Sequence, residues 1–131
     1  MARLADWEAR LRNLVAEAAD RSFMLGTWDC ALFAGAVVEA VTGFDIAAPY
    51  RGKYTTETGY MKALRRRKHS DIFGPFDKLT PRAGVMVCGC GDVVSDGDAV
   101  GLMWRGCALF LGEISGFERV PLHKLKFGWK L

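Results

Sequence analysis

The dipeptide Asp29-Cys30 stands directly before a long apolar run, residues 30–43, and is the feature of the chain that points to a definite chemistry. The composition of this run predicts a helix that Asp29 caps with its carboxylate and that Gly43 ends. The dipole and the free amides of a helix N-terminus favour negative charge there. We therefore expect the pKa of Cys30 to fall and its thiolate, the form that attacks carbonyl carbons, to accumulate.

A structural role for Cys30 is the alternative interpretation. Free cysteine is among the most buried residue types and packs like a small hydrophobic side chain. Phe33, Val37 and Val38 in the same run suit a helix that is surrounded by core on most sides. The sequence alone leaves both interpretations open.

The elements that must position Cys30 are predicted from periodicity. Apolar residues at helical spacing predict an amphipathic helix over residues 3–20, and residues 22–28 are expected to form a short extended link. Thr55 or Thr56 is expected to cap a third helix that the basic run Arg65–Lys68 closes. Residues 44–54 and 70–82 carry prolines and glycines and are expected to be loops, the second with one turn of structure.

Short β-prone segments separated by turn residues fill the chain from Gly84 onward. The expected strands are residues 85–88, 92–95, 100–104, 107–111 and 117–120, with 127–130 as a further edge strand. A tight hairpin turn is expected at Arg105-Gly106. Helices followed by an antiparallel meander predict one α+β domain over residues 1–131, with the N-terminal helices packed on a sheet of five or six strands.

Composition argues against several classes of protein. The net charge of +3 is small for a nucleic-acid-binding protein. No apolar stretch reaches the roughly 18 residues of a membrane span, and no signal-peptide core is visible. Four cysteines without an export signal indicate thiols that stay reduced after synthesis in a cytoplasm. No motif calls for a cofactor.

Three short motifs together resemble a known superfamily. They are Trp28-Asp29-Cys30 at a helix start, Gly91-Asp92-Val93-Val94 on one strand and Ala99-Val100-Gly101-Leu102 on the next. This order resembles the NlpC-type papain-like cell-wall endopeptidases. With the ending Trp129-Lys130-Leu131, it is most similar to a small branch of that superfamily from tailed phages and gene-transfer particles. The resemblance implies a papain-like fold.

The resemblance also assigns roles. Cys30 takes the position of the nucleophile, and Ala99 takes the position of the histidine that serves as base. A methyl group cannot accept a proton, and the strand Cys107–Leu111 offers no polar residue that would orient a histidine. The chain has two histidines, His69 in a basic stretch and His123 near the C-terminus, and the sequence leaves open whether either approaches Cys30.

The function that this resemblance implies is that of a structural or adaptor protein at a virion tail tip, with an incomplete and inactive cysteine-hydrolase site. It would be made in the cytoplasm of a bacterial host, and tail-tip or hub proteins would be its partners. The alternative is an active cysteine peptidase or amidase that cleaves peptidoglycan peptides during cell entry, with an unidentified base.

Further residues are candidates for a substrate cleft or a ligand site. Trp28 and Asp92 belong to the shared motifs, and Tyr50 and Tyr54 lie in a loop where exposed contacts are expected. Cys88, Cys90 and Cys107 lack the spacing of a zinc site, so we expect no metal, although a disulfide between two of them stays open. Arg65–Lys68 is most simply a solvated helix end, with phosphate contact or docking of an acidic partner as alternatives.

Overall fold

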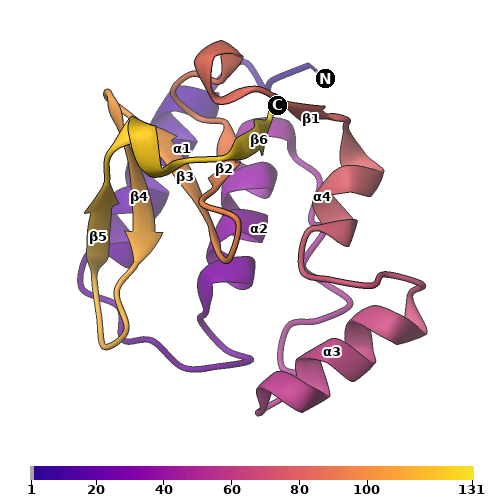
Figure 1. Cartoon of the computed structure of the whole chain (residues 1–131). Coiled ribbons are helices and arrows are strands. Elements are labelled where there is room, and N and C mark those ends of the chain that lie inside the picture. The colour runs from indigo at the N-terminus through magenta and orange to yellow at the C-terminus, as the bar shows by residue number, and fades with distance from the viewer. Residues whose placement is uncertain (1) are drawn as a thin grey trace.

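The computed structural model describes residues 2–131 and has the expected α+β architecture (Figure 1). Within these residues the α-helices are α1 (Trp7–Ala18), α2 (Cys30–Thr42), α3 (Glu57–Arg66) and α4 (Gly74–Leu79). The strands are β1 (Arg82–Ala83), β2 (Val93–Ser95), β3 (Val100–Trp104), β4 (Cys107–Leu111), β5 (Phe117–Val120) and β6 (Phe127–Trp129). Two short 3-10 helices, η1 (Val85–Val87) and η2 (Leu122–Lys124), complete the set.

The strands form one antiparallel sheet in the order β1-β6-β2-β3-β4-β5. The expectation that residues 127–130 form an edge strand is wrong, because β6 lies between β1 and β2. The expected strand over residues 85–88 is also wrong, because Val85–Val87 is a 3-10 helix. The Arg105-Gly106 hairpin is confirmed, with φ of 48° and 86° at its two turn residues.

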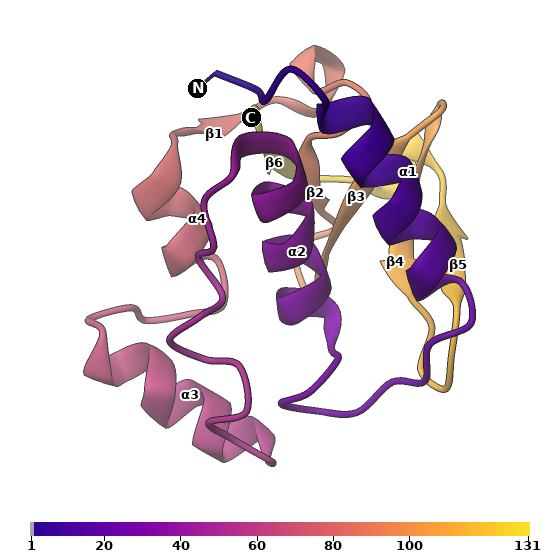
Figure 2. The same ribbon diagram turned by 180° about the vertical axis from the view of Figure 1, so that it is seen from behind.

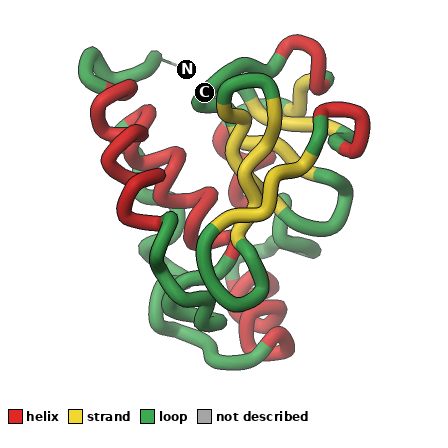
Figure 3. The backbone as a smooth tube through the Cα atoms, turned by 90° about the vertical axis from the view of Figure 1, so that its left-hand side faces the viewer, coloured by secondary structure: helices red, strands yellow, loops and turns green. Residues whose placement is uncertain are grey.

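Helices α1 and α2 cover one face of the sheet, so that helices and strands form two layers (Figures 2 and 3). Side chains alternate along the strands. In β3, Val100 and Leu102 pack into the core beneath α2, whereas Met103 joins a second cluster around Phe110 and Leu125 on the opposite face. This alternation fixes which residues of β3 face Cys30.

Helix α2 begins and ends as its sequence predicts. The carboxylate of Asp29 accepts a hydrogen bond from the Leu32 amide at 2.9 Å, and Gly43 adopts the left-handed conformation with φ of 85°. Phe33, Ala34 and Val37 are fully buried between the sheet and the other helices. Burial on nearly all sides of this helix holds the position of Cys30 at its first residue.

Other expected boundaries shift by a few residues. Helix α1 occupies the middle of the expected 3–20, and Thr56 caps α3 by accepting a hydrogen bond from the Gly59 amide at 3.0 Å. The link at residues 22–28 is not extended: it folds back through a turn that pairs Met24 with Trp28. In the part of the chain that the structure describes, no helix is long and apolar enough to cross a bilayer.

Candidate functional site

Cys30 occupies the first turn of α2, beside the start of β3. The hairpin turn between β2 and β3 lies next to this end of α2 (Figures 1 and 2). The thiol is half-buried, and the backbone of Val100 lies within hydrogen-bonding reach of it. The expected placement of a thiol at a helix start, facing the strand that begins at residue 100, therefore agrees with the structure.

The expected electrostatic effect on Cys30 is wrong, because its pKa is raised rather than lowered. Burial of the thiol is the largest cause, and the neighbouring charge of Asp29 is the second. Hydrogen bonding from the backbone of Val100 and of the first residues of α2 acts in the opposite direction but is outweighed. Asp29, which caps the helix, therefore places a negative charge beside the sulfur. This charge and the desolvation of the thiol together outweigh the pKa-lowering effect of the helix N-terminus.

The buried carboxylate of Asp29 connects the start of α2 to the segments around it. Its side chain is 2% exposed and accepts hydrogen bonds from the amides of Leu32 at 2.9 Å and Gly26 at 3.0 Å, and from the hydroxyl of Tyr54. Gly26 has a φ of 85°, and a Cβ there would collide with the carbonyl oxygen of Tyr54. With three donors on its carboxylate, Asp29 serves as a structural anchor for the start of α2 and the turn before it.

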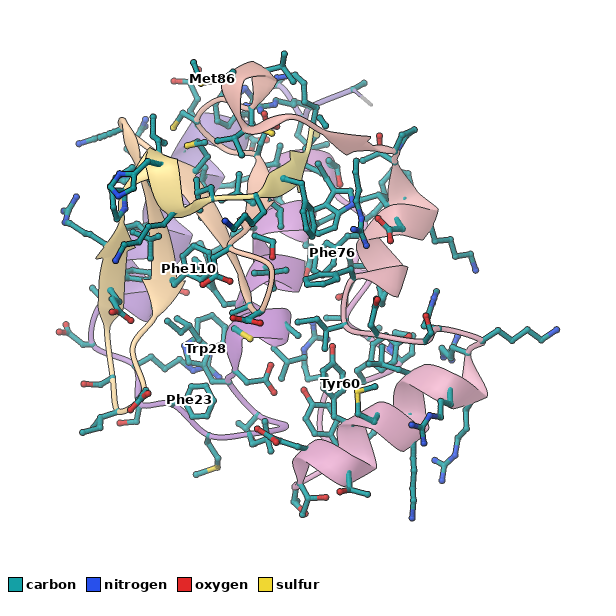
Figure 4. All side chains as sticks on the ribbon, in the orientation of Figure 1. Phe23, Trp28, Tyr60, Phe76, Met86 and Phe110 are labelled. Carbon is teal, nitrogen blue, oxygen red and sulfur yellow. The ribbon has the colours of Figure 1, made fainter. Side chains whose placement is uncertain are left out.

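Tyr54 and Tyr60, the second carried by α3 (Figure 4), lie near this carboxylate, and together with Tyr50 they form what we call the tyrosine wall. Tyr60 stacks on Tyr54 with ring centroids 4.5 Å apart and meets Tyr50 edge-on at 6.1 Å. Burial raises the pKa of both Tyr54 and Tyr60, and the charge of Asp29 raises them further. At neutral pH these hydroxyls are therefore proton donors and not bases.

Sequence reasoning missed Tyr60, although this residue lies near both Asp29 and Cys30. The sequence signal for Tyr60 was its helical spacing within α3, and that spacing indicated only that the residue packs against the core. Tyr50 and Tyr54 were expected to be exposed, and this is wrong: each is 5% exposed. Their rings form a small core with Ala63 and Leu64, so the loop that carries them is a packed wall and not a recognition surface.

Ala99 directly precedes β3, but its methyl group packs against the second cluster, on the face of the sheet away from α2. Neither histidine acts on the thiol. His69 packs against Gly74 at the start of α4, and His123 is exposed in η2. Asp29 supplies the charge that raises the pKa of the Cys30 thiol most after burial itself. No base comparable to an imidazole serves this thiol.

The hollow nearest the first turn of α2 is small, and Cys30 is not among the residues that line it. This hollow, lined by Ala31, Leu32, Tyr50 and Tyr60 among others, has a volume of about 10 Å³. That is roughly enough for one water molecule.

Trp28 and Asp92 do not line a cleft. Trp28 is 6% exposed, packs edge-on against Phe33 and lies beneath the guanidinium of Arg21, and its indole nitrogen has no hydrogen-bond partner within residues 2–131. Asp92 is fully buried and forms ion pairs with Arg3 at 2.9 Å and Lys130 at 3.1 Å. The assignment of Asp92 to a substrate cleft is therefore wrong, and its role is to tie the two ends of the chain together (Figure 3).

The remaining cysteines form no cross-link. Cys88, Cys90 and Cys107 are free thiols. No group of three or more potential metal ligands (His, Cys, Asp or Glu) occurs in the part of the chain that the structure describes.

Comparison with known sequences places the chain in one family. Residues 2–131 match the domain of unknown function DUF6950. The chain belongs to the DUF6950 family. No curated protein and no solved structure matches it. The DUF6950 domain thus accounts for the whole described chain, including Asp29, Cys30 and the tyrosine wall.

Proposed function

We propose that this DUF6950 domain is a structural or adaptor component of a phage or gene-transfer-particle tail, with an NlpC-type papain-like fold and a cysteine site that does not hydrolyse peptides. The tail location rests on the three motifs that resemble the NlpC-type superfamily. The α+β architecture, with Cys30 at the start of a buried helix beside β3, is compatible with that origin.

The absence of a base beside the thiol of Cys30 is the observation that carries the inactive assignment. Nucleophilic cysteines react as thiolates, and an adjacent imidazole or a lowered pKa supplies that form. Here the thiol pKa is raised, the nearest carboxylate is occupied by three donors, and both histidines lie elsewhere. Electrophiles would therefore meet a protonated and half-buried thiol.

Hydrolysis of peptidoglycan gives the direct test of this function. Purified sacculi incubated with the protein should release no new peptide ends, and Cys30→Ser should behave identically. In virion assembly, the Cys30→Ser chain should be incorporated into tails as efficiently as the unaltered chain, since the sulfur has no chemical role.

Cleavage of sacculi that disappears in Cys30→Ser would establish the alternative, an active cysteine peptidase or amidase. Failure of the unaltered chain to associate with any tail protein during assembly would overturn the adaptor role. The two readouts are independent, so that each part of the proposal is tested on its own.

A further inference from the structure

A basic groove runs between the end of α3 and helix α4. Three adjoining hollows of about 290, 520 and 670 Å³ form it, and Arg67, His69 and Lys78 line all three. The cationic lining also includes Lys53 from the loop before α3, Arg66 from its last turn, Lys68 from the turn after it and Arg82 from β1. The groove lies at the opposite end of α3 from its N-cap, where the chain turns toward α4 (Figure 1).

Most of the cations in this groove lack acidic partners. Lys53, Arg67, Lys68 and Lys78 are exposed, and none of them belongs to an ion pair within residues 2–131. Two carboxylates, Asp71 and Asp77, also line one of the hollows, and Asp77 pairs with Arg82 at 2.9 Å. Because the cations that line the three hollows outnumber these two carboxylates, the groove carries a net positive charge, although the net charge of the whole chain is only +3.

Complementing the helix dipole does not account for this arrangement. Basic residues in the last turn of α3 offset the negative end of that helix, but Lys53 precedes α3 and Lys78 belongs to α4. Side chains from three separate segments meet at one hollow. Like charges that converge from different elements repel one another, and a cleft lined by one sign of charge attracts ligands of the opposite sign.

Backbone strain at Lys68 is an independent sign of a role for this groove. Lys68 has a φ of 65°, its amide donates to the carbonyl of Arg65 at 2.9 Å, and the next amide donates to Leu64 at 3.0 Å. This is the Schellman ending of a helix, in which glycine is the usual residue because a Cβ is strained there. A lysine at this position brings a cation to the groove at a cost in stability.

The walls of the groove favour a peptide over a nucleic acid. Ile46, Pro49, Pro75 and Leu79 give it an apolar side, and the Tyr50 ring beneath them is buried. Single-stranded nucleic acids bind through bases stacked on exposed aromatic rings, and no exposed aromatic side chain lines these hollows. Carboxylates would meet the Arg and Lys side chains, while an aliphatic side chain would fit the apolar wall.

We propose that the basic groove docks an acidic peptide segment of a partner protein, with glutamate or aspartate side chains on Arg67, Lys68 and Lys78 and an aliphatic side chain against Pro49 and Leu79. The identity of the partner as a tail protein rests on the proposed function. The binding chemistry itself does not depend on Cys30.

Fluorescence polarisation with a labelled synthetic peptide of glutamate and leucine tests the docking. The unaltered protein should bind this peptide, and more weakly as salt rises from about 0.05 to about 0.3 M because the contacts are ionic. Arg67→Glu with Lys78→Glu should weaken binding at least about tenfold. The matched control, Lys124→Glu with Lys126→Glu, makes the same charge change outside the groove and should leave binding within about twofold.

The Lys68→Gly variant tests whether the Lys68 side chain contributes to peptide binding. Relief of the left-handed strain should raise the melting temperature by a few degrees, while peptide binding weakens about threefold or more. Unchanged binding in this variant would remove Lys68 from the proposed contacts and contradict the proposal as stated.

Three further results would overturn the docking proposal. They are no peptide binding at the lower salt concentration, equal binding by a charge-reversed variant that melts like the unaltered protein, and tighter binding of a labelled single-stranded DNA of similar charge. Inorganic phosphate should compete only weakly, because it offers nothing to the apolar wall. None of these results bears on sacculus cleavage or on assembly into tails, so failure here is distinguishable from failure of the proposed function.

Discussion

Replacing Asp92 by alanine is expected to lower the free energy of unfolding by about 3–5 kcal/mol, because breaking a buried ion pair leaves its partners uncompensated. The fully buried carboxylate holds Arg3 and Lys130, and it also accepts hydrogen bonds from the amides of Gly89 at 2.8 Å and Leu131 at 2.8 Å. Alanine would remove four partners at once. Chemical denaturation followed by circular dichroism measures the change.

Two further variants serve as controls for the Asp92 prediction. Asp92→Asn keeps one acceptor oxygen, so its free energy of unfolding should fall by less than that of the alanine variant. The fall that remains comes from removal of the negative charge. Asp98→Ala, at an exposed position in the turn after β2, should change stability by less than about 0.5 kcal/mol. A loss below about 1 kcal/mol in Asp92→Ala would show that the termini are not held through this carboxylate.

Replacing Asp29 by alanine should cost about 3–4 kcal/mol, the second largest effect. The loss of an N-cap contributes about 0.5–2 kcal/mol, and a buried donor left without an acceptor costs about 1–3 kcal/mol. Here the stranded donors would be the Gly26 amide and the Tyr54 hydroxyl. Chemical denaturation should therefore show that Asp29→Ala lowers the free energy of unfolding far more than Cys30→Ala does.

The comparison with an exposed aspartate separates burial from residue type. Asp45 also accepts a backbone hydrogen bond, from Ala47 at 3.3 Å, and pairs with Arg51 at 2.9 Å, but it lies at the surface. Asp45→Ala should cost less than about 1 kcal/mol. Tyr54→Phe removes one donor from Asp29 and should cost about 2 kcal/mol, because hydrogen bonds to charged groups are worth about 1.5–3 kcal/mol. Equal losses for Asp29→Ala and Asp45→Ala would contradict the anchoring role.

Local signals in the sequence predicted most of the elements. Asp29 and Gly43 mark the ends of α2 because capping depends on a few neighbouring backbone groups. Arg105-Gly106 marks a hairpin for the same reason. Val85–Val87 was misjudged because a β-branched pair favours a strand, whereas η1 is a short turn whose residues pair with no neighbouring strand.

Long-range contacts explain what sequence reasoning missed. Strand β6 enters the middle of the sheet by pairing with both β1 and β2, which no local pattern reveals. Arg3 lies 89 residues from Asp92 along the chain, so the ion pair that buries this carboxylate has no signature at short spacing. Tyr50 and Tyr54 read as exposed loop residues because the α3 side chains that cover them follow later in the sequence.

The placement of Cys30 at the start of a helix follows from its sequence, but the chemistry of its thiol does not. A helix start predicts a lowered thiol pKa when the dipole acts alone. Burial and the charge of Asp29 reverse the sign, and both depend on the packing of α2 against the sheet and the tyrosine wall. Whether a cysteine is a nucleophile therefore depends on its surroundings in the folded chain more than on the motif that surrounds it.

The rate at which iodoacetamide alkylates Cys30, followed against pH by peptide-resolved mass spectrometry, tests the absence of an activated thiolate most directly. Burial and the charge of Asp29 raise the pKa of the Cys30 thiol, so that the thiol is mostly protonated at pH 7. The rate should therefore be slower than that of the exposed Cys90 in the same molecule and should climb about tenfold per pH unit from about pH 7 to 9. A fast rate for Cys30 that stays flat between about pH 6 and 8 is the signature of a preformed thiolate and would contradict an inactive site.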